Sequence, residues 1–464
     1  MLGMELDART AGPISAASLG SSRFKQRYGL KSAYLTGAMY KGIASKEMVV
    51  AMGKAGLIGY LGTGGLRLDQ IESDLRVIRT ELAPDRSYGM NLLCDLSRPD
   101  LEEQTVGLFM KHGVRFIEAA AYIHVTPSLV WYRLKGLRRR GDGHIESAHN
   151  VLAKVSRPEV ATAFLQPAPE AIVRQLVQSG RLTPEEADLS RHIPMASDLC
   201  VEADSGGHTD RGIAYVLMPV MMSLRDEMTA RYGYREKVQL GAAGGIGTPN
   251  AAAAAFIMGA DFILTGSINQ CTVEAGTSTI VKEMLQTAGA QDTAYAPAGD
   301  MFEIGAKVQV FKKGILFPAR ANKLYEIYQR YNSIDEIEPK TKSQIEKYFG
   351  RSFDDVWAET EAYYRQSRAT RLEQSEWSPK QKMALIFRWY FVHSGRLALS
   401  GSESGKLDYQ IHCGPALGAF NRWVQGTELE PWQNRHVAKI AERLLDGTAK
   451  FLNDRFARLA SGTA

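Results

Sequence analysis

The chain has 464 residues, of which 45% are hydrophobic and 23% charged, and its formal net charge is +5. This composition excludes an intrinsically disordered chain, and the charge is too small to indicate nucleic-acid binding. The four cysteines form no CxxC pair, which argues against a zinc site and a disulfide framework. The N-terminus lacks a signal-peptide pattern, and the longest apolar run, Gly212–Leu224, is too short to span a bilayer. We therefore expect a cytoplasmic protein without membrane or nucleic-acid partners.

Eight short β-rich segments alternate with helical segments up to about residue 270. In chain order they are Ser32–Met39, Leu57–Gly65, Ser87–Leu93, Val114–Ala121, Asn150–Ser156, Ser197–Asp204, Val238–Gly245 and Asp261–Ser267. Strands that alternate with helices indicate a parallel sheet, and eight of them predict a (β/α)8 TIM barrel. A doubly wound open sheet is the alternative.

After about residue 298 the pattern becomes mostly helical, as in "SPKQKMALIFRWYFVHS". We expect a barrel at residues 1–300 and a mostly α-helical C-terminal extension at residues 301–464. From Lys307 onward, 25 Lys and Arg residues outnumber 18 Asp and Glu residues. This excess of positive charge suits an acidic partner, and the alternative is that these residues simply lie on solvent-exposed helix surfaces.

Two glycines and a histidine directly follow the sixth predicted strand, in "VEADSGGHT". Active sites of TIM barrels lie at the carboxyl ends of the strands, which is where this sequence places His208. Gly206 and Gly207 permit a tight turn and the close approach of a flat ligand, because they lack a Cβ. Asp204 either orients His208 or a ligand hydroxyl, or caps the loop. An ordinary turn with an incidental histidine is the alternative.

Two neighbouring glycine-rich loops predict a phosphate site. The seventh strand runs into "AAGGIGTPNAAAAAF", in which Thr248 is the expected N-cap and Pro249 the first helical residue. N–H groups at a helix N-terminus attract anions, and Gly266 and Ser267 add donors after the eighth strand. Loops after strands seven and eight commonly bind phosphate in this fold, although a well-capped turn remains the alternative. The glycine spacing is not GxGxxG, so it does not indicate a Rossmann dinucleotide site.

Three other strands carry candidate ligand contacts. Small residues around Gly37–Met39 would let a ring system lie on the backbone. Asn91 could hydrogen-bond the polar edge of a heterocycle, or it forms a turn. Lys154 either points inward to an anion or an electron-rich ring, or extends outward between helices.

With these residues, the barrel resembles the FMN-dependent family of nitronate monooxygenases and flavin enoyl-acyl-carrier-protein reductases. Members share a strand-six "GGH", a strand-seven "AGGI" and a strand-eight Gly-Ser or Gly-Thr. The sequence is more similar still to the PfaD group, the stand-alone enoyl reductases of polyunsaturated fatty acid synthases and trans-acyltransferase polyketide synthases. That similarity lies in "VEADSGGHTD", "AKVSRPEVA", "AAGGIGTPNAAAAAFIMGADFILTGSINQCTVEAGTS", "FEIGAKVQVFKKGILFPARANKLYEIY" and "DYQIHCGPALGAFNRWV". Together these segments extend over nearly the whole chain.

The resemblance implies FMN as cofactor, NADPH or NADH as hydride donor, acyl carrier protein domains as partners, and a homodimer. It implies His208 as the catalytic residue and no metal. The residues implied to bind FMN are Gly37, Ala38, Met39, Asn91, Lys154, Asp204, Gly206, Gly207, Gly244, Gly245, Ile246, Gly266 and Ser267. Related barrels often carry Glu where this chain has the shorter Asp204.

Three functions follow as hypotheses. The first is reduction of the α,β-double bond of carrier-bound enoyl thioesters in polyketide or polyunsaturated fatty acid biosynthesis. The second is a nitronate-monooxygenase-like oxidation with oxygen as acceptor. The C-terminal extension argues against the second, because a small nitroalkane needs no carrier-docking surface. The third is a non-catalytic assembly protein, against which the phosphate loops and His208 argue.

Overall fold

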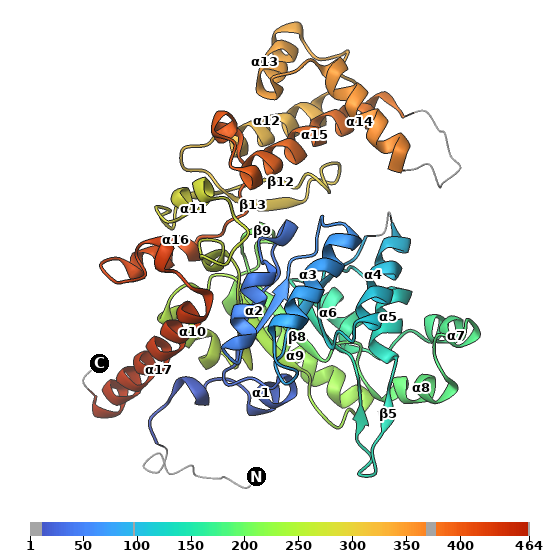
Figure 1. Ribbon diagram of the computed structural model, residues 1–464, viewed down its shortest axis with the longest axis vertical. Coiled ribbons are helices and arrows are strands. Elements are labelled where there is room, and N and C mark those ends of the chain that lie inside the picture. Colours follow the sequence, from blue (N-terminus) through green and yellow to red (C-terminus); the bar gives the residue numbers. More distant parts are fainter. Residues whose placement is uncertain (1–11, 96–97, 368–376, 463–464) are drawn as a thin grey trace. The chain divides into compact units, whose positions relative to one another are not determined.

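The computed structural model describes residues 12–95, 98–367 and 377–462, and these fall into two compact units (Figure 1). The barrel unit takes its described residues from within 12–203, 212–276 and 423–462. The second unit takes its described residues from within 204–211 and 277–422. Neither unit is therefore one continuous stretch of chain.

A closed parallel barrel forms the first unit. Its strands are β1 (Tyr34–Thr36), β2 (Ile58–Leu61), β3 (Gly89–Leu93), β4 (Phe116–Ala120), β7 (Asn150–Val155), β8 (Asp198–Glu202), β10 (Gln239–Ala243) and β11 (Phe262–Thr265). Thr36 of β1 pairs with Thr265 on one side and with Gly59 on the other, so the sheet has no free edge. All eight predicted strands are confirmed, and the open-sheet alternative is wrong.

Helices surround this barrel. They are α1 (Ser22–Tyr28), α2 (Lys46–Lys54), α3 (Leu68–Glu81), α4 (Pro99–Lys111), α5 (Pro127–Leu134), α6 (Pro158–Leu165), α7 (Glu170–Gln178), α8 (Pro184–Leu189), α9 (Ala214–Tyr232), α10 (Pro249–Ile257) and α17 (Val437–Ser461). Proline occupies the first turn of α4, α5, α6, α8 and α10, where its missing N–H costs no helical hydrogen bond. Short 3-10 turns, η1 (Ala16–Ser18), η2 (Tyr40–Gly42), η3 (Ser190–His192), η4 (Ser267–Asn269) and η6 (Trp432–Asn434), and a small hairpin, β5 (Arg138–Arg139) with β6 (Ile145–Glu146), complete the unit.

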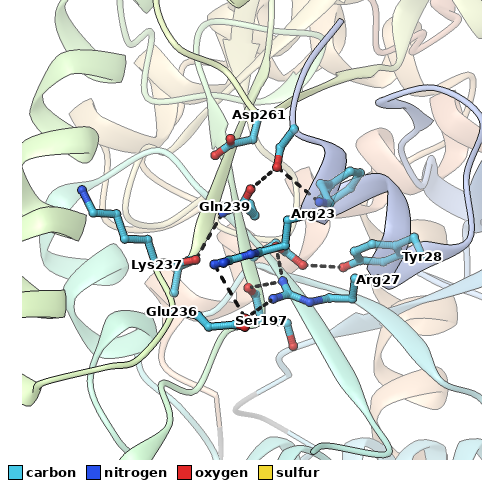
Figure 2. A network of polar contacts seen from close by, with 12 residues as sticks. Arg23, Arg27, Tyr28, Ser197, Glu236, Lys237, Gln239 and Asp261 are labelled. Atoms are coloured by element: carbon cyan, nitrogen blue, oxygen red, sulfur yellow. Dashed lines mark hydrogen bonds and ion pairs between the residues drawn. The ribbon is translucent and has the colours of Figure 1, made fainter. Parts of the chain in front are cut away.

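Helix α1 seals the amino-terminal end of the barrel. The ring of Phe24 stacks on Phe262 with centroids 4.1 Å apart, and Tyr28 stacks on Phe116 at 4.6 Å. Figure 2 shows the polar contacts around Arg27 and Tyr28 at this end. Arg27 Nη1 lies 2.6 Å from the fully buried Asp198, and the Tyr28 hydroxyl donates to the same carboxylate at 2.9 Å. With this end filled by side chains, the carboxyl ends of the strands are left to carry a ligand site.

The last helix belongs to the barrel unit. Thr448 Oγ1 on α17 is 3.4 Å from the carbonyl oxygen of Pro249, and a Cβ at Gly447 would lie 2.7 Å from the Pro249 ring. The division into units thus differs from the expected boundary at residue 300, which falls inside the second unit. The reason is that α17 packs on α10, so the end of the chain returns to the barrel.

The second unit combines a small antiparallel sheet with helices. Its strands, in sheet order, are β12 (Thr293–Pro297), β13 (Lys307–Phe311) and β9 (Gly207–His208). Its helices are α11 (Thr279–Leu285), α12 (Phe317–Arg330), α13 (Pro339–Phe349), α14 (Phe353–Ser367), α15 (Pro379–Ser400), η5 (Glu403–Asp408) and α16 (Ala416–Val424), the last of which ends just inside the barrel unit. The core is aromatic and includes Phe302, Phe317, Phe349, Phe387, Tyr390 and Phe391. The predicted mostly helical C-terminal extension is confirmed, although the prediction missed the sheet.

Along the described residues, no helix combines the length and the apolar character needed to cross a bilayer.

Candidate active site

The loop after β10 has the backbone of an anion-binding turn. Gly244 and Gly245 have φ of 88° and 72°, a region that glycine enters without steric cost. Helix α10 follows at once, and Thr248 Oγ1 caps it by accepting from the N–H of Ala251 at 3.3 Å. Among the turn and loop hydrogen bonds of the described residues, none uses the N–H of Gly245 or Ile246 as donor. These two N–H groups belong to a glycine turn that directly precedes the N-cap of α10, an arrangement that favours a bound anion.

The loop after β11 lies beside this turn, because Ala243 of β10 pairs with Leu264 of β11. The buried side chain of Asn269 fixes the loop by donating to both oxygens of Thr265 at 3.0 Å. A Cβ added at Gly245 or Gly266 would meet no heavy atom within 4 Å. The two loops therefore border open space, as the predicted phosphate site requires.

The segment Gly37–Met39 is held rigidly after β1. The N–H of Gly37 donates to Thr265 at 3.0 Å, and a Cβ at Gly37 would lie 2.6 Å from the side chain of Leu264. A Cβ at Gly62 would overlap the carbonyl of Met39, so this backbone tolerates no bulk there. The segment is a fixed surface built from small residues and main chain.

Lys154 forms the centre of a buried charge cluster. Its Nζ lies 3.0 Å from Glu202 and 3.8 Å from Glu118. Glu118 Oε2 also accepts from the N–H of Ala38 at 3.1 Å. Since β1 and β4 are not neighbours, that carboxylate lies in the barrel interior. Lys154 thus points inward, and the alternative that it extends outward is wrong.

The two neighbouring glutamates keep the ammonium group of Lys154 protonated. Burial alone would lower the pKa of Lys154, but Glu202 and Glu118 outweigh it and raise the pKa. Burial raises the pKa of Glu118, and the nearby Glu202 adds to that effect, although Lys154 and the Ala38 N–H oppose it. A positive group is therefore fixed in the barrel interior.

Asn91 lies inside β3, so the alternative of a turn-forming asparagine is wrong. Its Nδ2 donates to the carbonyl of Glu118 at 3.0 Å, and Thr63 donates to the carbonyl of Asn91 at 2.8 Å. One of the two N–H groups of the side-chain amide thereby bonds β4 and orients the amide.

The segment with Asp204 and His208 belongs to the second unit, although β8 leads directly into it. Gly207 and His208 form β9, in which His208 pairs with Val308. Gly207 has φ of 88°, and Gly206 N lies 2.8 Å from where a Cβ at Gly414 would stand. Gly206 and Gly207 therefore allow the tight backbone that leads from β8 into β9.

Asp204 caps this turn. It accepts from Thr209 Oγ1 at 2.6 Å, from the Tyr295 hydroxyl at 2.5 Å and from Gln309 Nε2 at 3.4 Å. Burial and the bond to Asp204 raise the pKa of Tyr295 to about 12. Of the two roles predicted for Asp204, the structure shows the loop cap, and the carboxylate that bonds His208 is a different one.

That carboxylate is Asp300, whose Oδ1 lies 2.8 Å from His208 Nε2. Both side chains are half exposed, at 49% for His208 and 59% for Asp300. Burial would raise the pKa of Asp300, but the contact with His208 lowers it. His412 lies close by, and burial together with the charge of His208 lowers its pKa to about 4. His412 is therefore neutral at neutral pH.

The predicted site residues thus form two groups. The barrel unit brings together Gly37, Ala38, Met39, Asn91, Lys154, Gly244, Gly245, Ile246, Gly266 and Ser267, while the second unit holds Asp204, Gly206, Gly207 and His208. Sequence reasoning missed Glu118, Glu202, Asp300 and His412. Glu118 could have been found as a charge inside the apolar strand "VRFIEAAA", whereas nothing local marks Asp300.

Within the part of the chain that is described, no cluster of three or more His, Cys, Asp or Glu side chains has the arrangement of a metal site.

Several known proteins are similar to most of this chain. The chain is 57% identical over 443 residues to the polyketide biosynthesis protein PksE of Bacillus subtilis, covering 95% of this chain and 57% of PksE. It is 42% identical over 424 residues to a component of the polyunsaturated fatty acid synthase of Thraustochytrium, covering 90% of this chain and 28% of that protein. The chain therefore spans little more than half of one of these relatives and less than a third of the other.

One solved structure covers the chain almost completely. The enoyl reductase domain of MlnA, from the macrolactin biosynthesis cluster of Bacillus amyloliquefaciens, superposes with a TM-score of 0.91 at 48% identity. The match covers 95% of this chain and 99% of that domain. Residues 331–409 also match the family model described as acyl-carrier-protein S-malonyltransferase, inserted helical domain. From these matches, the chain belongs to the PfaD-type enoyl reductase family of polyketide and polyunsaturated fatty acid synthases.

Proposed function

We propose that this chain reduces the α,β-double bond of enoyl thioesters carried by an acyl carrier protein, during polyketide or polyunsaturated fatty acid biosynthesis. The proposal takes FMN as cofactor and NADPH as hydride donor. The observation that carries it is the 48% identity to an enoyl reductase domain over 95% of the chain. The names of PksE and of the fatty acid synthase component supply the biosynthetic context.

The barrel unit fits FMN. Open space beside Gly245 and Gly266, with the N–H donors of the glycine turn that precedes α10, suits the phosphate. The rigid backbone of Gly37–Met39 suits a flat ring, and Asn91 and Lys154 suit its polar edge or the ribityl chain. When bound, FMN would supply hydride transfer, from the nicotinamide to the β-carbon of the enoyl thioester.

The remaining chemistry belongs to the protein. Addition of a hydride to the β-carbon must be matched by a proton at the α-carbon. We assign His208 to that step, either as the proton donor or as the group that hydrogen-bonds the thioester carbonyl oxygen. Asp204, Gly206 and Gly207 shape the turn that carries it.

An acyl carrier protein is the proposed partner, docked on the region 301–464. Support comes from residues 331–409, which resemble a helical domain of an enzyme that acts on acyl carrier protein. The excess of Lys and Arg after residue 307 would favour the encounter with an acidic carrier, so association should weaken as salt is raised. A homodimer remains a prediction, which light scattering of the purified protein would check.

An anaerobic spectrum of the purified protein tests this function. Yellow protein should bleach with NADPH and recover its colour with a crotonyl-pantetheine thioester, whereas NADH should act more slowly. Recovery with oxygen alone, together with turnover of a nitronate, would favour the monooxygenase-like alternative. Protein that cannot be loaded with FMN would overturn both enzymatic functions.

A further inference from the structure

The carboxylate that bonds His208 sits on a rigid loop. Asp300 lies between β12 and β13, and the N–H of Ala298 closes this loop by donating to Ala306 at 2.8 Å. A Cβ at Gly299 would lie 2.6 Å from Phe391, so the backbone beside Asp300 is pressed against the core. On the other side, Phe302 is fully buried, with its ring 5.5 Å from that of Phe391. The packed backbone at Gly299 and the buried ring of Phe302 therefore fix the position of Asp300 between them.

The histidine is fixed as well. β9 pairs with β13, and the N–H of Thr209 donates to Lys307 at 3.1 Å. The backbone of His208 is thus held by the same hairpin whose loop carries Asp300. The loop with Asp300 leads into β13, and β9 with His208 pairs with β13. The sheet therefore holds the two residues of the 2.8 Å contact near each other.

Several other charged or titratable groups of the surrounding segments have partners of their own. Asp204 is bound to Tyr295 and Thr209, and Glu303 lies 3.2 Å from Arg388. Lys307 places its ammonium 5.0 Å from the ring centroid of Tyr325. His412 pairs by a β-bridge with Val310, and it is neutral above pH 6 because its pKa is lowered to about 4. Among these groups, Asp300 supplies the negative charge that contacts the imidazole.

A carboxylate contact determines the tautomer of an imidazole. An ionised carboxylate only accepts hydrogen bonds, so Nε2 of His208 must carry a proton whether the ring is neutral or charged. Gain and loss of the ring's second proton then take place at Nδ1. A carboxylate that holds a histidine in one tautomer and orientation is the arrangement on which general acid–base catalysis depends in several enzyme classes.

We propose that Asp300 is a positioning residue that fixes the orientation and tautomer of His208 and supports its positively charged form. This inference rests on the proposed function, in which His208 protonates the α-carbon or holds the thioester carbonyl. Asp300 itself would contact neither substrate nor cofactor.

The test separates the two half-reactions. Asp300→Asn keeps the shape and removes the charge, and Asp300→Ala removes the hydrogen bond too. We expect FMN content and the rate of flavin reduction by NADPH to stay within about twofold of the wild type. Reoxidation by the crotonyl-pantetheine thioester should slow by about tenfold or more in both variants. Asp300→Glu should recover part of that loss.

The pH profile of reoxidation distinguishes positioning from a plain surface ion pair. Without the carboxylate, the charged imidazole is less favoured, so it loses its proton at a lower pH. The decline of the reoxidation rate on the alkaline side should therefore begin about one pH unit lower in Asp300→Asn. Asp300→Ala combined with His208→Ala should be no slower than His208→Ala alone.

Glu303→Gln is the matched control, since it removes a carboxylate of the same loop that bonds Arg388 instead, and it should behave as the wild type. Unchanged reoxidation and an unchanged pH profile in Asp300→Asn would overturn the proposal, as would losses that multiply in the double variant. Nitrogen NMR of the His208 ring reads the tautomer without any substrate. A wild-type ring with Nε2 unprotonated would overturn the positioning role, whereas a wild type that the thioester never reoxidises would refute the proposed function alone.

Discussion

At the scale of single residues, the proposed chemistry depends on His208. His208→Ala should leave FMN bound, because the loops proposed to bind its phosphate belong to the barrel unit. Reoxidation by an enoyl thioester should slow by about a hundredfold, the usual contribution of a general acid. Anaerobic stopped-flow spectroscopy measures both half-reactions, and unchanged turnover would remove His208 from the mechanism.

A second residue-scale prediction concerns Glu118. Glu118→Ala would leave the N–H of Ala38 and one side of Lys154 without their carboxylate, inside the barrel. Loss of a buried hydrogen-bond acceptor costs about 1–3 kcal/mol, and the shifted Gly37–Met39 segment should also weaken FMN binding. Chemical denaturation and fluorescence titration with FMN measure the two effects. Glu81→Ala, which removes an exposed carboxylate beside Lys54, should change neither.

The neutral His412 makes stability depend on pH. Its folded pKa of about 4 lies below the value of 6.5 for an unperturbed histidine. The unfolded chain therefore binds an extra proton below pH 6.5, so stability is lost as the pH falls from 6.5 towards 4. His412→Gln should flatten this part of the melting-temperature profile, and a profile as steep as the wild type would contradict the burial of a neutral ring.

At the scale of elements, the phosphate loop can be tested with a pair of glycines. Gly245→Ala forces a Cβ into a left-handed backbone at φ of 72°, and Gly233→Ala does the same at 62° at the end of α9. Neither Cβ would meet a neighbour within 4 Å, so each change costs about 1–2 kcal/mol of stability through the backbone alone. Only Gly245→Ala should also weaken FMN binding, because of the two glycines only Gly245 lies in a loop proposed to bind the phosphate. Equal FMN affinity in the two variants would argue against the loop as the phosphate site.

The sequence predicted the barrel elements well and the small sheet poorly, for physical reasons. Most residues of the barrel strands are apolar and buried, and turn residues bound the strands, which makes them visible without tertiary information. β9 is two residues long, and one of them is glycine, so no local preference marks it as a strand. In β13, "KVQVF", polar and apolar residues do alternate, but the segments after it in the sequence are helical, and the region was therefore predicted to be mostly helical.

For the candidate site too, local features were predicted from the sequence, and contacts between distant residues were not. Glycines, prolines and caps at the strand ends predicted the turn after β10 and the start of α10, because their backbone requirements are local. Phosphate binding by this turn stays a prediction. The partner of His208 lies 92 residues further along the chain, and only the pairing of β9 with β13 brings it near. The sequence left Asp204 open either as a partner of His208 or as a cap of the loop, and the structure shows the cap.

At the scale of the whole molecule, the end of the chain completes the barrel unit. Leu444 on α17 is fully buried, whereas Leu459 on the same helix is 67% exposed. Leu444→Ala should destabilise the barrel unit by about 2–5 kcal/mol, as large-to-small changes in a core do. Leu459→Ala should have little effect, and denaturant unfolding followed through bound FMN measures both. Equal stabilities would show that α17 does not hold the barrel together.

The assignment of residues 204–211 to the second unit has a consequence for building hybrid enzymes. In sequence, segment 204–211 lies between two segments of the barrel unit. In the structure, its strand β9 pairs with β13 of the second unit, so a hybrid must take this segment and β13 from the same parent. A hybrid that took only residues 277–422 from a relative would set a foreign β13 and a foreign Asp300 against the native His208. A hybrid that keeps the pairing of β9 with β13 intact therefore requires that segments 204–211 and 277–422 be exchanged together.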